Sequence, residues 1–165
     1  MSLTETVAEY LANISPEIAT LLIAALPFGE LRGALPIAIT VFKLPILAAY
    51  FWSVAGNMLP VFFILWLIGP LSHWLSIRSK MVKNFFDWFF ERTHKKTNSK
   101  IQQYGAIALV LFVAIPLPFT GAWTGSVAAY LFGIKKRVAM PLIFIGVLIS
   151  GFIVSLLTVG AVSIF

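Results

Sequence analysis

Four long apolar stretches dominate the chain, and short polar segments separate them. They run over residues 18–42, 44–75, 107–134 and 138–165. The second and the fourth are each long enough for one helix of about 20 residues across a bilayer. The first and the third contain prolines and glycines in their middle, and each is too short for two full spans. The pattern therefore predicts two transmembrane helices and two broken helical hairpins.

Composition supports a membrane environment. Hydrophobic residues make up 60% of the chain and charged residues 11%, and the mean hydropathy is +0.97. A soluble domain has about 25% charged residues. We therefore expect an all-α integral membrane protein with a single membrane domain over residues 1–165. The chain has no cysteine, which removes disulfides and thiolate metal ligands.

Two further segments are predicted to lie at the membrane surface. Residues 1–15 have apolar side chains at helical spacing, which predicts an interfacial N-terminal helix, and they lack the basic residues that begin a cleaved signal peptide. Residues 77–100 are basic and include an aromatic-rich amphipathic stretch at 81–90. Such a stretch favours the inner interface, next to anionic lipid headgroups. Because the bilayer accounts for the aromatic residues, we expect membrane lipids as partners and no nucleic acid.

The breakers of the two hairpins correspond. Pro27 and Phe28 in the first hairpin recur as Pro118 and Phe119 in the second. Further pairs follow after a one-residue gap: Gly33 with Gly125, Lys43 with Lys135, and Gly56 with Gly146. The pattern indicates an internal duplication like that of many transporters. The first repeat would cover residues 16–75 and the second 101–165.

The positive charges predict how the repeats are oriented. Ten of the twelve lysines and arginines lie in residues 77–100 and 135–137, and basic loops favour the cytoplasm. A single crossing by residues 107–134 would place these loops on opposite sides. We therefore expect residues 107–134 to re-enter from the cytoplasm and residues 18–42 from outside, with both termini outside. The result is an inverted repeat with two opposed re-entrant hairpins; ordinary helices with proline kinks are the alternative.

Glu30 and Arg32 are the only charged residues in the first hairpin. An ionised group at membrane depth costs a few kcal/mol on insertion scales and usually faces a protein interior or a pathway. One interpretation makes Glu30 a proton or cation site and Arg32 a partner for a phosphate or carboxylate. The other makes them a structural pair that fastens the hairpin.

The second hairpin offers uncharged candidates. Pro118 breaks the helix, Thr120 and Thr124 carry hydroxyl groups, and Gly121 stands where a new helix would begin. That helix start would direct its positive dipole end towards the membrane centre. The Trp123 indole needs a partner when buried, or it could face a cationic substrate. Close packing of the hairpins is the alternative role for this segment.

Asn57 lies in the middle of the first long span, one turn before Pro60. Its amide could bind substrate or join two helices by a hydrogen bond. The sequence contains no recognisable catalytic motif: it has no phosphate-binding loop, no Ser-His-Asp set and no carboxylate pair. We expect no enzyme activity, no cofactor and no metal, since His73 and His94 have no further ligands nearby in the sequence.

Three motifs resemble a known family. They are Glu30-Leu-Arg-Gly-Ala-Leu-Pro, Gly56-Asn57 and Pro116-Leu-Pro-Phe-Thr-Gly-Ala-Trp-Thr-Gly. The chain resembles the small multidrug export proteins of bacteria and archaea from about Pro27 onwards, and is more distantly similar to the DedA membrane proteins, which include lipid-carrier flippases. The resemblance implies a multi-pass protein of a prokaryotic cell membrane. The second hairpin departs from the DedA pattern, because it has no arginine pair within the membrane.

Together these features predict a secondary transporter for proton-coupled export of small amphiphilic compounds. Substrate would bind between the hairpin tips near Glu30, Arg32 and the second-hairpin residues, and Glu30 would exchange a proton for substrate. Two alternatives stay open. One is a DedA-like flippase for anionic lipids or polyprenyl-phosphate carriers, and the other is a non-transporting scaffold that presents the basic segment. A protein with so few helices would need a second copy to bury its polar core, so a homodimer is a further expectation.

Overall fold

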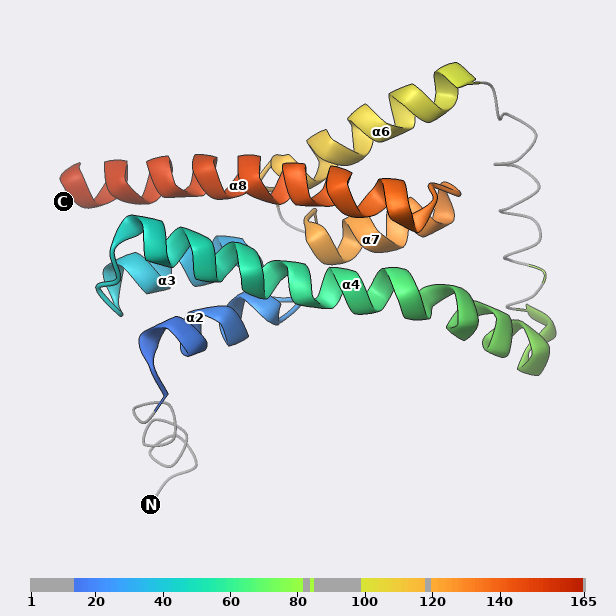
Figure 1. Ribbon diagram of the computed structural model, residues 1–165, viewed down its shortest axis with the longest axis horizontal. Helices are drawn as coiled ribbons and strands as arrows, with labels where there is room; N and C mark the ends of the chain where they lie inside the picture. Colours follow the sequence, from blue (N-terminus) through green and yellow to red (C-terminus); the bar gives the residue numbers. More distant parts are fainter. Residues whose placement is uncertain (1–13, 82–83, 85–98, 118–119, 165) are drawn as a thin grey trace. The chain divides into compact units, whose positions relative to one another are not determined.

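The computed structural model describes residues 14–81, 84, 99–117 and 120–164. These residues form helices and no strand, which confirms the all-helical class. Two short helices and one long helix follow one another twice along the chain (Figure 1): α2 (Pro16–Ala25), α3 (Glu30–Thr40), α4 (Ile46–Arg78), α6 (Ser99–Ala114), α7 (Ala122–Leu131) and α8 (Lys136–Ile164). Residues 1–13 of the predicted helix over residues 1–15, most of the basic segment 77–100 and Pro118 lie outside the described residues.

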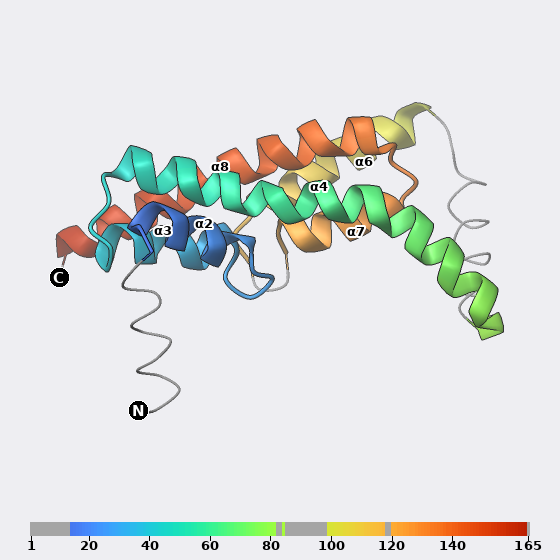
Figure 2. The same ribbon diagram turned by 60° about the horizontal axis from the view of Figure 1, so that its bottom comes forward.

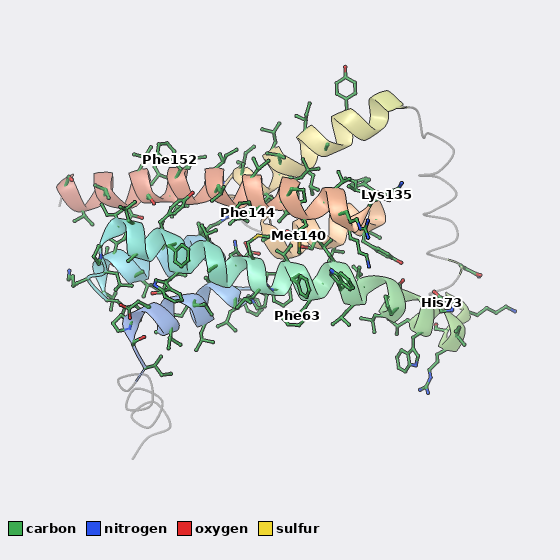
Figure 3. The ribbon with its side chains drawn as sticks, in the orientation of Figure 1. Phe63, His73, Lys135, Met140, Phe144 and Phe152 are labelled. Atoms are coloured by element: carbon green, nitrogen blue, oxygen red, sulfur yellow. The ribbon has the colours of Figure 1, made fainter. Side chains whose placement is uncertain are left out.

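Two of the described helices, α4 and α8, are long and apolar enough to cross a bilayer. Their bounds lie within three residues of the predicted spans 44–75 and 138–165. Large apolar side chains project from them (Figure 3): Phe63 on α4 is 56% exposed and Phe152 on α8 is 62% exposed. In a membrane, lipid tails would cover such side chains at no free-energy cost, whereas exposing them to water would be unfavourable.

Local sequence determines where α2 begins and ends. The Ser15 hydroxyl accepts a hydrogen bond from the Ile18 amide at 3.4 Å, and Pro16 occupies the first turn. Both features are typical of a helix N-terminus. The helix ends before Leu26, whose ψ of 143° is extended, because the following Pro27 disfavours a helical conformation there.

The chain divides into two compact units, and each long helix contributes to both. Unit 1 contains residues 1–57 and 150–165. In this unit α2 packs against α3, and the first part of α4 lies close to α2 (Figures 1 and 2). Leu31, Leu35 and neighbouring alanines form a fully buried face of α3. The hairpin formed by α2 and α3 is thus an integral part of the core of unit 1.

Unit 2 contains residues 58–149, and α6 packs against α7 within it. A hydrogen bond between the Ser72 and Tyr130 hydroxyls ties α4 to α7. The Lys136 ammonium lies 3.9 Å from the centre of the Trp66 ring, which ties the start of α8 to α4. The last part of α4 bends (Figure 2), as expected of a helix that contains Pro70.

One boundary differs from the expectation. The second hairpin was expected to begin at residue 107, where the apolar stretch starts, but α6 already begins at Ser99. The polar residues before residue 107 continue the same helix, because no proline interrupts them. An apolar stretch predicts which part of a helix lies within the membrane, and the helix itself can continue past the membrane surface.

Candidate functional site

Glu30 is the first residue of α3 and is 8% exposed. Its amide donates a hydrogen bond to the Leu26 carbonyl at 2.9 Å, and its φ is 43°. A left-handed conformation costs an ordinary residue roughly 1–2 kcal/mol, so the connection from α2 to α3 holds Glu30 under strain. Strain of this kind is concentrated at functional sites in proteins.

Arg32 follows Glu30 after one residue and is half-buried. The two opposite charges attract each other electrostatically. A carboxylate and a guanidinium in such apolar surroundings lower the cost of burial for one another. The first hairpin therefore carries a charge pair whose positive member is more accessible than its negative member.

Asn57 lies on α4 and is 3% exposed. Its side-chain oxygen, Oδ1, has no hydrogen-bond partner among the described residues, and the same is true of Ser53 Oγ, whose side chain is 0% exposed. Residues four apart on a helix share a face, so the two groups are neighbours. The sequence reasoning missed Ser53, although its position one turn before Asn57 was a usable signal.

Close helix approaches show where this face of α4 points. A Cβ at Gly56 would lie 2.9 Å from the Cβ of Ala24, so Gly56 faces α2. A Cβ at Gly151 of α8 would lie 2.8 Å from Tyr50 Cε2, so Tyr50 faces α8. With 3.6 residues per turn, Ser53 and Asn57 point between these two directions. Their polar groups are therefore directed to the interior of unit 1.

Glu30 belongs to the same region of unit 1. On one side its amide contacts Leu26, two residues after Ala24, which abuts α4. On the other side its neighbour Leu31 reaches α8, with Cδ1 3.2 Å from a Cβ built at Gly151. These contacts place the start of α3 next to α2 and α8, in the same unit as Ser53 and Asn57. Unit 1 thus gathers a buried carboxylate, an amide and a hydroxyl.

The candidates of the second hairpin lie in unit 2. The Thr120 hydroxyl lies 2.9 and 2.8 Å from the carbonyl oxygens of Ile115 and Leu117, which share its single O–H. Gly121 has a φ of 144° and precedes α7. The exposed Thr124 hydroxyl is 3.4 Å from the Gly121 carbonyl, and Trp123 is half-buried.

The two sets of candidates differ in their hydrogen bonding. The Thr120 hydroxyl bonds to two carbonyls of the connection before α7 that also accept backbone amides, and it stabilises the backbone at this point. In unit 1, by contrast, Asn57 Oδ1 and Ser53 Oγ are buried without a partner among the described residues. Unit 1 is therefore the better candidate for a ligand-binding site.

Metal-binding clusters of histidine, cysteine, aspartate and glutamate are absent from the described part of the chain. His73 lies on the last part of α4 (Figure 3) and is exposed. The candidate groups in unit 1 are the Glu30 carboxylate, the Asn57 amide, the Ser53 hydroxyl and the Arg32 guanidinium. Such a set can bind a cation, a proton or a polar headgroup.

Two membrane-length helices and a buried charged residue in a helical hairpin are typical of integral membrane transport proteins. Residues 30–153 match the family described as "Putative small multi-drug export protein". This match covers most of the chain and begins at Glu30, so the chain belongs to that family of membrane proteins. No curated protein and no solved structure matches the chain.

Proposed function

We propose that the protein is a secondary transporter that exports small amphiphilic cations in exchange for protons, with Glu30 as the coupling residue. The observation that carries the proposal is the carboxylate of Glu30, more than nine-tenths buried in the same compact unit as two unpartnered polar groups. A carboxylate in this setting can hold a proton or a cation, and changing between them changes the charge of the site. Family membership supports export as the direction of transport.

The other candidate residues take supporting roles in this proposal. Arg32 balances the charge of Glu30, and Asn57 orients the bound group through its amide. Trp123 offers an aromatic face to a cation in unit 2. Gly121 and Thr120, with Pro118, set the start of α7, and Thr124 contributes a second hydroxyl. Single substitutions at these residues, each tested for loss of transport, would measure the contributions separately.

Backbone conformation supports the internal repeat. Four described residues have positive φ, and they fall into two pairs: Glu30 with Gly121, and Lys43 with Gly133. The first pair stands at the start of the second helix of each hairpin, and the second pair stands three residues before each long helix. This pairing places Lys43 opposite Gly133, two residues from the lysine that the sequence pattern suggested.

Close packing supports the repeat independently. Gly56 in α4 packs against α2, and Gly146 in α8 packs against α6, where its Cβ would lie 2.7 Å from the Cβ of Val113. Each glycine thus meets the first helix of its own hairpin. We infer two copies of one helical motif of opposite orientation, with hairpins that re-enter the membrane and alternate access to the site.

Exposed basic residues support a cytoplasmic location for the loop before α8. Lys135, Lys136 and Arg137 are all exposed. The Arg78 guanidinium at the end of α4 lies 4.7 Å from the centre of the Trp74 ring, a pairing typical of the membrane interface. We propose that these residues mark the cytoplasmic surface of a prokaryotic cell membrane and that both termini lie outside.

A second candidate function rests on Arg32. A half-buried guanidinium in a membrane hairpin could bind the phosphate of a lipid headgroup, which would make the protein a flippase for anionic lipid carriers. The two functions differ in which member of the charge pair contacts the substrate. They can therefore be separated by single substitutions.

The test compares Glu30→Gln and Arg32→Gln in proteoliposomes, in one assay for export of a fluorescent lipophilic cation and one for flipping of a labelled polyprenyl phosphate. The exporter predicts cation transport that Glu30→Gln abolishes and Glu17→Gln, at the half-exposed start of α2, leaves intact. The flippase predicts lipid movement that Arg32→Gln abolishes. Wild-type protein that moves neither substrate would contradict both functions.

A further inference from the structure

Two helical serines differ from most hydroxyl groups on the described helices. Six hydroxyls on the described helices donate to the carbonyl four residues earlier, at 2.7–2.8 Å: Thr20, Thr40, Ser76, Ser126, Thr158 and Ser163. Ser53 Oγ and Ser155 Oγ are buried and have no partner in the described part of the chain. Buried polar atoms nearly always have a partner, and an exception can indicate an ion or water held there.

A main-chain oxygen is released on the same face of α4, one turn after Ser53. Pro60 lies inside α4 and has no N–H, so the carbonyl of Gly56 lacks the donor that a helix normally supplies. The C-terminal end of α2, with its partial negative charge, abuts α4 here through Ala24. Ser53 Oγ, the Gly56 carbonyl and Asn57 Oδ1 therefore form a set of oxygen acceptors on one face of α4.

The second repeat shows that packing alone does not require these polar groups. Gly146 packs against α6 as Gly56 packs against α2. The residues placed around Gly146 as Ser53 and Asn57 are around Gly56 are Ile143 and Val147, which are 0% and 1% exposed. The same helix contact is thus made with apolar side chains. Ser53 and Asn57 introduce unpartnered polar atoms that the packing does not need.

From these observations we infer that Glu30, Ser53, Asn57 and the Gly56 carbonyl bind a monovalent alkali cation inside unit 1. Hard cations prefer oxygen ligands, and released carbonyls and helix C-termini bind Na⁺ in transporters with broken helices. A single carboxylate, partly neutralised by Arg32, suits one positive charge better than two. This inference extends the proposed function at Glu30, and a binding measurement tests it without any transport step.

The experiment follows the thermal unfolding midpoint of the full-length protein in detergent as Na⁺ replaces N-methylglucamine at constant ionic strength. We expect the midpoint to rise with Na⁺ concentration, because a ligand that binds the folded state stabilises it. Glu30→Gln and Asn57→Val should abolish this rise. Arg32→Gln should shift the rise to lower Na⁺ concentrations, because it removes a repelling charge.

A matched control separates ion binding from a general effect of polarity. Ser53→Ala and Ser155→Ala each remove a buried, unpartnered hydroxyl from unit 1. Both should raise the midpoint without Na⁺, because each removes an unsatisfied polar group. The Na⁺-dependent rise should be weakened by Ser53→Ala and unchanged by Ser155→Ala. An equal Na⁺ response in the two variants would overturn the inference.

Binding of ²²Na⁺ to the purified protein gives the second measurement. Saturable binding that excess K⁺ or Li⁺ displaces supports an alkali-cation site, whereas no saturable binding together with a flat midpoint overturns it. If the wild-type protein shows proton-coupled export but no response to Na⁺, the cation site is refuted and the proposed function stands. Na⁺ binding without any transport would refute the proposed function and leave the site standing.

Discussion

Glu30 combines three features that rarely coincide in one residue. It is charged, it is more than nine-tenths buried, and its φ of 43° is left-handed. The residue before α7, Gly121, also has a positive φ, which glycine adopts without steric cost. A glycine would therefore satisfy the backbone at position 30. The strain of a glutamate there is consistent with a need for its carboxylate.

Part of the site could be predicted from residues alone. The charge of Glu30 within an apolar stretch was visible in the sequence, and so was the break at Pro27, because both depend on local chemistry. For Ser53 the sequence shows only its position one turn before Asn57, and not that its hydroxyl group lacks a partner. Its lack of a partner results from how α4 packs against α2 and α8, which a single sequence does not encode in any local pattern.

At the residue scale, Gly56→Ala should destabilise the protein by about 1–3 kcal/mol, the usual cost of overpacking. A Cβ there would lie 2.9 Å from the Cβ of Ala24, and closer still to the Leu21 carbonyl. Gly160→Ala in α8 is the matched control, because no atom lies within 4 Å of its Cβ. Unfolding in detergent measures both, and equal stabilities would contradict the close approach of α2 to α4.

At the scale of elements, prolines and hydropathy predicted most of the helices. The break between α2 and α3 and the bounds of α4 and α8 follow from Pro27 and from the length of the apolar stretches. The start of α6 at Ser99 was missed, because polar residues can continue a helix beyond the apolar region. The ties between helices in unit 2 were also missed, since they join residues far apart in the sequence.

One of these ties, the hydrogen bond between Ser72 and Tyr130, holds α7 against α4. Tyr130→Phe should cost about 0.5–1.5 kcal/mol of unfolding free energy, the usual contribution of a hydrogen bond. Tyr104→Phe is the control, because Tyr104 is 71% exposed. In a double-mutant cycle, Ser72→Ala should add little to Tyr130→Phe. Additive losses would show that the two hydroxyls stabilise the fold independently.

At the scale of the whole molecule, the order of elements follows from the sequence and the membrane topology is a prediction from charge. The twofold succession of short, short and long helices is present in the structure. The face of the bilayer that each hairpin enters is predicted from the positive residues. The arrangement of the helices does not determine it.

Topology can be tested directly, because the chain has no native cysteine. Single cysteines in place of Lys96 and Lys136 should both react with an impermeant reagent only from the cytoplasmic face. A cysteine in place of Glu17 should react only from outside. Labelling of positions 96 and 136 from opposite faces would mean that the intervening segment crosses the membrane, and the re-entrant arrangement would be wrong.

Lumenal pH in proteoliposomes tests most directly whether Glu30 couples protons to export. Lipophilic cations are added to vesicles that carry a proton gradient, and wild type is compared with Glu30→Gln and with Glu17→Gln. We expect the cations to trigger a proton flux in wild type and in Glu17→Gln, and no flux in Glu30→Gln. A cation-triggered flux that survives in Glu30→Gln would contradict the central role of this carboxylate.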